Sequence, residues 1–171
     1  MTATLQVPTG KDTVLSLYIT AKDAYEMWKA SPETVKILDV RTIEEALFVG
    51  HPTMAWIIPA FLQMYEWNPD KRNFPMTPNP EFLARVKEIA APTDTLLVTC
   101  RSGGRGALAV NLLAQAGYKH AYNILDGVEG DTVKDPDSVY CGQRVKNGWK
   151  NAGAPWTYTM DPERFQVPRT S

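Results

Sequence analysis

The sequence is poor in the side chains that most often bind metals. It contains only two cysteines, Cys100 and Cys141, and two histidines, His51 and His120, among 171 residues. Two cysteines exclude a disulfide framework and a four-cysteine zinc site, and the histidines lack metal-ligand spacing. We therefore expect no metal and no other cofactor, and we interpret both histidines as structural residues.

Long apolar runs and an excess of charge of one sign are also missing. No apolar run approaches the roughly 20 residues that cross a bilayer, and the N-terminal MTATLQVPTGKDTV lacks the basic patch and apolar core of a secretory signal. The 18 basic and 19 acidic residues give a formal net charge of −1, which argues against binding nucleic acid or an anionic membrane through bulk charge. We expect a cytoplasmic protein with neither kind of partner.

Apolar segments typical of strands alternate with segments of helical periodicity along most of the chain. Strands are expected at residues 14–20, 35–40, 55–59, 95–99 and 120–125. Helices are expected at residues 21–30, from Thr42 onward, from Pro80 to about 89, and at about 105–116. This alternation is typical of βαβ units and predicts an α/β fold with a mainly parallel sheet.

Local signals mark the ends of these helices. Thr20 is the expected N-cap of the first helix, and Thr42 forms a capping-box pattern with Glu45. Pro80 stands at the expected first position of the third helix. Gly117 is the expected C′ residue of the helix that follows Cys100.

Residues 60–79 are expected to form a long irregular loop, because they contain three prolines among several aromatic and sulfur-containing side chains. Loops of this length in a compact domain tend to be functional. The segment follows the carboxyl end of a strand, so we expect Tyr65, Trp67 and Phe74 to form the wall of a pocket or of a partner site. The alternative is that these aromatic residues cap the core.

The motif CRSGGRG, which begins at Cys100, has the features of a reactive cysteine site. Cys100 lies at the carboxyl end of an expected strand, the edge at which open parallel sheets bind ligands. The following helix offers unpaired N–H groups, and Gly103 and Gly104 allow a turn whose N–H groups point inward. Together with Arg101 and Arg105, these features favour the thiolate, which is the nucleophile. We therefore interpret Cys100 as catalytic rather than as a small buried residue.

The spacing between Cys100 and Arg105 distinguishes two chemistries. Cysteine phosphatases place five residues between the cysteine and the arginine, and their loop surrounds a phosphate. Here four residues separate the two side chains. A tighter ring of N–H groups suits a single atom, such as the outer sulfur of a persulfide. The spacing favours sulfur transfer, with a cysteine phosphatase or an arsenate reductase as the alternatives.

Three stretches of the sequence resemble the rhodanese family of sulfurtransferases. They are ILDVRTIEEALFVGHPTMAWIIPAF (37–61), LLVTCRSGGRGALAVNLLAQAGYKHAYNILDGVEG (96–130) and GWKNAGAPW (148–156). The resemblance implies a rhodanese-like three-layer α/β/α domain at residues 13–157, built on a five-stranded parallel sheet. A flexible arm, residues 1–12, would precede this domain, and a tail, residues 158–171, would follow it.

The resemblance also implies roles for individual residues. Cys100 would carry the persulfide, and backbone amides between Arg101 and Arg105 would hold its outer sulfur. The substrate-binding residues implied in this way are Arg101, Ser102, Gly103, Gly104 and Arg105. The two arginines would bind an anionic donor such as thiosulfate. Asp39 and Arg41 would support the loop, unless they form a purely structural ion pair or cap.

The implied activity is that of a thiosulfate sulfurtransferase-like enzyme. Sulfane sulfur would pass through a Cys100 persulfide to cyanide in vitro, or to a thiol or protein acceptor in vivo. The non-enzymatic alternative is a sulfur-carrier or regulatory module with little turnover of its own. Cys141, after the last expected strand, is a candidate second thiol that pairs with Cys100 or accepts its sulfur. The alternative is an isolated surface cysteine.

Overall fold

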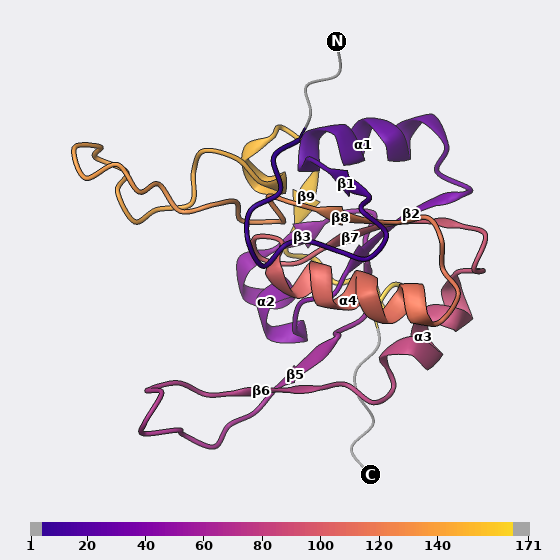
Figure 1. The fold of residues 1–171 in the computed structure, drawn as a ribbon, viewed down its shortest axis with the longest axis horizontal. Coiled ribbons are helices and arrows are strands. Elements are labelled where there is room, and N and C mark those ends of the chain that lie inside the picture. The colour runs from indigo at the N-terminus through magenta and orange to yellow at the C-terminus, as the bar shows by residue number, and fades with distance from the viewer. Residues whose placement is uncertain (1–4, 166–171) are drawn as a thin grey trace.

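Five parallel strands form the main sheet of the computed structural model, which describes residues 5–165 (Figure 1). In spatial order the strands are β1 (Tyr18–Ile19), β8 (Ala121–Ile124), β7 (Thr95–Thr99), β2 (Val35–Asp39) and β4 (Trp56–Ile57). The helices are α1 (Ala21–Ala30), α2 (Ile43–Val49), α3 (Phe82–Ile89) and α4 (Gly104–Gln115). The outer parts of the expected N-terminal arm and C-terminal tail, residues 1–4 and 166–171, lie outside the described residues.

Alternate side chains of the central strands build two cores, one on each face of the sheet. On one face Leu38, Leu96 and Val98 pack with buried residues of α3 and α4. On the other face Ile37 and Leu97 pack with α1 and with the fully buried Trp149. Both faces are therefore covered, which explains why neighbouring residues of β2 (Ile37 and Leu38) and of β7 (96–98) are apolar. This arrangement confirms the predicted three-layer α/β/α fold with a five-stranded parallel sheet.

The predicted helix signals act as expected. The Thr20 hydroxyl accepts a hydrogen bond from Asp23 N, and Thr42 and Glu45 form a reciprocal capping box. Gly117 has a positive φ of 95° just beyond α4. The third helix begins at Phe82 rather than at Pro80, because Asn79 first turns the chain by accepting a hydrogen bond from Glu81 N. Within residues 5–165 no helix has the length and apolarity needed to cross a membrane.

The strand expected at residues 14–20 is much shorter in the structure. Only Tyr18–Ile19 pairs with the sheet, because the chain turns just before it. Ser16 donates its N–H to Thr13 O and has a positive φ of 51°, which a strand does not allow. Apolar composition alone predicted a strand here, and the turn ends it.

The segment 60–79 is not the irregular loop that its prolines predicted. β5 (Phe61–Gln63) pairs antiparallel with β6 (Met76–Pro78), and the resulting ribbon projects from the body of the protein (Figure 1). Proline is tolerated in a ribbon edge, because its missing N–H can face away from the partner strand. This is a correction to the sequence-based prediction.

The aromatic residues of this ribbon do not cap the core. Tyr65, Trp67 and Phe74 are 71%, 54% and 50% exposed, respectively. Trp67 and Phe74 instead contact one another edge to face, with ring centroids 5.3 Å apart. The core-capping alternative is therefore wrong.

A second excursion, residues 131–148, precedes the C-terminal segment that returns to the domain. Both this excursion and the β5–β6 ribbon project on the side of the sheet where β7 and β8 end, which is the left of Figure 1. The chain then forms a short 3₁₀ turn, η1 (Trp149–Asn151), and β9 (Trp156–Thr157), which pairs with β3 (His51–Pro52). Trp149 is fully buried, donates its indole N–H to Pro155 O and contacts the ring of Tyr25. The C-terminal segment is thus part of the second core.

We predict that Trp149→Ala lowers the free energy of unfolding by about 3–5 kcal/mol, since it leaves a large cavity in a buried cluster. Trp67→Ala is the matched control and should cost under about 1 kcal/mol, because its side chain is half exposed. Urea denaturation followed by circular dichroism measures both. Equal effects would contradict the placement of Trp149 in the core.

Candidate functional site

Cys100 lies immediately after β7, at the carboxyl edge of the sheet, as the sequence predicted. Its side chain is buried, with only 1% of the residue exposed. The sulfur accepts a hydrogen bond from the backbone N–H of Gly103 at 3.1 Å. Gly103 is also the N-cap of α4 and has a φ of 100°, a left-handed conformation that a residue with a side chain rarely adopts. The turn therefore directs the first orphan amide of the helix at the sulfur.

Backbone contacts from the segment after β8 hold the other side of this loop. Val128 N donates to Cys100 O at 2.8 Å, and Glu129 N donates to Arg101 O at 3.0 Å. Gly127 permits this approach, because a Cβ atom there would lie 2.5 Å from the carbonyl oxygens of Cys100 and Arg101. These three residues were not singled out from the sequence, although the stretch LDGVEG that contains them carried part of the family resemblance.

Arg105 does not extend freely toward a ligand but forms a two-pronged ion pair with Glu45 of α2. Both Nη···Oε distances are 2.6 Å, and the two side chains are 20% and 19% exposed. Burial alone would raise the pKa of Glu45, but the hydrogen bonds from Arg105 outweigh it and hold this pKa below its ordinary value. The charge of Arg105 is thus balanced, whereas Arg101 is exposed and has no ion-pair partner within residues 5–165.

Asp39 and Arg41 form a fully buried ion pair at the end of β2, with Nη2 and Oδ2 2.7 Å apart. Arg41 also donates to Gly50 O at 2.7 Å, which ties the end of β2 to the end of α2. Burial lowers the pKa of Arg41, but the Asp39 carboxylate outweighs this effect and raises it. Neither side chain hydrogen-bonds to residues 101–105. The end of β2 instead meets the site through the sheet, because Val40 N donates to Thr99 O at 2.9 Å, next to Cys100.

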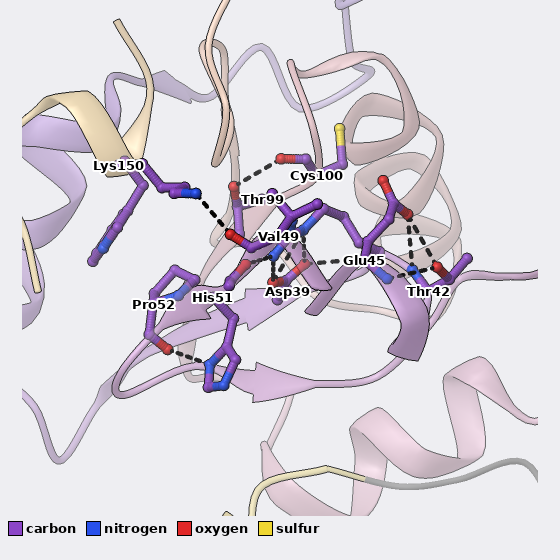
Figure 2. A network of polar contacts seen from close by, with 12 residues as sticks. Asp39, Thr42, Glu45, Val49, His51, Pro52, Thr99, Cys100 and Lys150 are labelled. Carbon is purple, nitrogen blue, oxygen red and sulfur yellow. Dashed lines mark hydrogen bonds and ion pairs between the residues drawn. The ribbon is translucent and has the colours of Figure 1, made fainter. Parts of the chain in front are cut away.

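The two histidines do not contact the sulfur. His51 is buried, and its ring nitrogens lie 3.0 Å from Pro52 O and 3.1 Å from Thr159 O. Figure 2 shows that ring turned toward Pro52, away from Cys100. His120 is exposed at the start of β8, and its carbonyl accepts a bond from Leu96 N.

The ribbon residues approach the site to different degrees. The Tyr65 hydroxyl bonds to Glu44, which is adjacent in sequence to the Arg105 partner Glu45. Arg105 also lies 3.7 Å from the sulfur of Met76 on β6. Trp67 and Phe74 contact each other nearer the tip of the ribbon. Of the ribbon, it is Met76 on β6 that contacts the Arg105 side chain.

Cys141 is exposed on the excursion at 131–148 and is not in a disulfide bond with Cys100. The local turn is held by backbone bonds, with Cys141 N donating to Ser138 O and Gly142 N to Val133 O. Its role as a second thiol stays a prediction.

A sequence profile of the rhodanese-like domain matches residues 20–132, two thirds of the chain. The chain belongs to the rhodanese-like domain family. An uncharacterized protein of Rickettsia prowazekii is 32% identical over 123 residues, which cover 71% of this chain and 82% of that protein. Thiosulfate sulfurtransferase 18 of Arabidopsis thaliana is 39% identical over 92 residues, covering 53% of this chain and 61% of that enzyme.

Among solved structures, a crystal structure of a protein from M. tuberculosis superimposes with a TM-score of 0.64 at 29% identity. The match covers 82% of this chain and 96% of that one. The two proteins therefore share their fold over almost the whole length of the M. tuberculosis chain.

Gly103→Ala should destabilise the protein by at least about 2 kcal/mol, because it forces a side chain into a left-handed conformation. The new Cβ would also lie 2.5 Å from Leu125 O. Gly104→Ala is the control, since the nearest atom to its Cβ is 4.0 Å away, and its stability should change by less than about 1 kcal/mol. Thermal and urea denaturation test the pair. Tolerance of alanine at residue 103 would contradict the loop geometry.

Glu45→Gln should lower stability at pH 7 by about 1.5–3 kcal/mol, because an amide cannot accept both bonds from Arg105. The pKa of Glu45 in the folded protein lies below its ordinary value of 4.5. Its carboxylate therefore stabilises the fold above that pH, and this contribution is lost as the pH falls through the folded pKa. The stability difference between wild type and variant should shrink below about pH 4.5. A difference that stays constant between pH 7 and pH 3 would exclude this pairing.

Proposed function

We propose that the protein is a sulfurtransferase that moves a sulfane sulfur from a thiosulfate-like donor to a thiol acceptor through a persulfide on Cys100. The observation that carries the proposal is the bond from Gly103 N–H to the Cys100 sulfur, in a loop at the N-terminus of α4. Family membership and the similarity to a plant thiosulfate sulfurtransferase support it. An inert core cysteine has no need for a left-handed glycine that aims an amide at its sulfur.

In the first half-reaction the Cys100 thiolate attacks the outer sulfur of thiosulfate. A sulfur–sulfur bond forms to Cys100, and the bond between the outer sulfur and the sulfonate sulfur breaks. Sulfite leaves with the electron pair of that bond, and Cys100 becomes a persulfide anion. The Gly103 amide and the positive end of α4 stabilise the negative charge before and after the transfer.

In the second half-reaction an acceptor thiolate attacks the outer sulfur of the persulfide. A new sulfur–sulfur bond forms on the acceptor, and the Cys100 thiolate leaves with the electrons of the bond that breaks. Cyanide would take the same sulfur as thiocyanate. Because each half-step is a displacement at one sulfur, the sequence of steps is covalent catalysis with ping-pong kinetics.

Recognition of the donor falls mainly to Arg101 in this proposal. Arg105 is already neutralised by Glu45, whereas the exposed Arg101 side chain follows the nucleophile directly and has no ion-pair partner within residues 5–165. Cys100 is 1% exposed, so the donor has to insert its terminal sulfur into the loop while its sulfonate stays outside. A small or narrow donor fits this requirement.

We expect the intact wild-type chain to gain the mass of one sulfur atom after incubation with thiosulfate, and to lose it again when cyanide is added. Cys100→Ser should gain nothing. Cys141→Ser is the matched control, because that thiol is exposed and should not be needed for loading. Mass spectrometry of the intact chain measures all three proteins.

Loading at Cys141 instead of Cys100, or hydrolysis of an aryl phosphate without loading, would overturn the proposal. Rapid loading followed by slow release to cyanide and to small thiols would favour the sulfur-carrier alternative over an enzyme with free turnover. Initial rates measured with varied thiosulfate and cyanide separate these cases, since parallel double-reciprocal lines are expected for ping-pong transfer.

A further inference from the structure

The chain just before β1 runs along α4 and contacts the loop that holds Cys100. Val14 N donates to the side chain of Asn111 on α4 at 2.9 Å. The aliphatic stem of Lys11 packs on Gly103, since its Cδ lies 2.8 Å from the position of a Cβ there. A segment that the sequence predicted to be a flexible arm thus touches the residue that donates to the catalytic sulfur.

Lys11 is fixed by two partners. Its ammonium group donates to Leu125 O at 2.7 Å and pairs with Asp131 at 2.8 Å, and only 12% of its side chain is exposed. Burial raises the pKa of Asp131, but hydrogen bonds from Lys11 and Asn147 outweigh it and hold this pKa below its ordinary value. The ammonium therefore joins the N-terminal segment to the chain that follows β8.

Asn123 on β8 links this segment to the catalytic loop. Its side-chain NH₂ group donates both to Lys11 O at 3.1 Å and to Gly103 O at 3.0 Å, and the residue is fully buried. Gly103 in turn donates its N–H to Cys100 Sγ. One continuous set of hydrogen bonds runs from Lys11 through Asn123 and Gly103 to the sulfur. Gly106 makes room for Asn123, because a Cβ there would lie 2.5 Å from Asn123 Oδ1.

We propose that Lys11 is a positioning residue for sulfur transfer: its ammonium anchors the N-terminal segment to Leu125 O and Asp131. The anchored backbone, through Lys11 O and Asn123, then holds the Gly103 amide aimed at Cys100. The expected effect on the rate of sulfur loading rests on the proposed function. The expected effect on the Gly103 amide does not. This positioning role differs from a role in binding the donor, because the Lys11 ammonium is occupied by Leu125 and Asp131.

Lys11→Met tests the proposal, since methionine keeps an apolar stem over Gly103 and removes both bonds of the ammonium. We expect the maximal rate of Cys100 loading by thiosulfate to fall about tenfold, as expected when an anion-stabilising donor is loosened but not removed. The concentration of thiosulfate that gives half this rate should change less than about twofold, because Arg101 is untouched.

Lys36→Met is the matched control. Lys36 pairs with Asp94 at 2.9 Å, with side chains 18% and 22% exposed, but this pair lies at the amino ends of β2 and β7. Both variants lose one partly buried Lys–Asp pair, so a general effect of losing such a pair would slow loading in both. Only Lys11→Met should slow loading. If Lys36→Met slows loading equally, or if Lys11→Met leaves the rate unchanged, Lys11 has no positioning role.

Amide hydrogen exchange gives a readout that does not depend on sulfur chemistry. We expect exchange at Gly103 to speed up at least about tenfold in Lys11→Met, while exchange at Leu97 inside β7 stays unchanged. Unchanged exchange at Gly103 would overturn the positioning role. Wild-type protein that fails to load sulfur, yet shows the faster Gly103 exchange in Lys11→Met, would refute the proposed function and leave the structural link intact.

Discussion

The hydrogen bond from the Gly103 amide to the sulfur of Cys100 is the interaction on which the site depends. It exists because Gly103 adopts a positive φ of 100° at the junction between β7 and α4. That single turn places a buried sulfur against the N-terminus of a helix, where unpaired amides and the helix dipole favour negative charge. Among residues 5–165 no group of His, Cys, Asp and Glu could hold a metal ion, and the bonds of the His51 ring go to Pro52 O and Thr159 O. The environment of the sulfur is therefore set mainly by backbone groups, above all by the Gly103 amide.

A loop built from backbone groups has to be held from outside, and three separate parts of the chain do this. The segment after β8 pairs with the carbonyls of Cys100 and Arg101, and α2 holds Arg105 through Glu45. The third part is the N-terminal segment, which reaches Gly103 through Lys11 and Asn123. Side chains of the loop are used for this support. The charge of Arg105, for example, is paired with Glu45 and joins α4 to α2. Arg101, by contrast, is an exposed cation directly after Cys100 in the chain.

Short-range patterns in the sequence were sufficient to predict much of this architecture. The capping box at Thr42 and Glu45, the apolar strands β2 and β7, and the glycine-rich turn after Cys100 each depend on neighbouring residues, and each is present in the structure. The prediction was wrong where a turn or a strand pairing, and not the apolar pattern, decides the local structure, as at Ser16 and in the segment 60–79. The β5–β6 ribbon forms despite its prolines because its two halves pair across a turn. The contacts of Lys11 with Leu125 and Asp131 join residues more than a hundred positions apart in the sequence. A pattern of neighbouring residues cannot predict such contacts.

The most direct test of this account is a crystal structure of the protein after reaction with thiosulfate. The account predicts one additional sulfur atom bonded to Cys100 Sγ, enclosed by the loop and accepting hydrogen bonds from backbone amides between Arg101 and Arg105, with the Arg105–Glu45 pair intact. An unmodified Cys100 beside a free tetrahedral anion would contradict it, as would an added sulfur that accepts no bond from these amides.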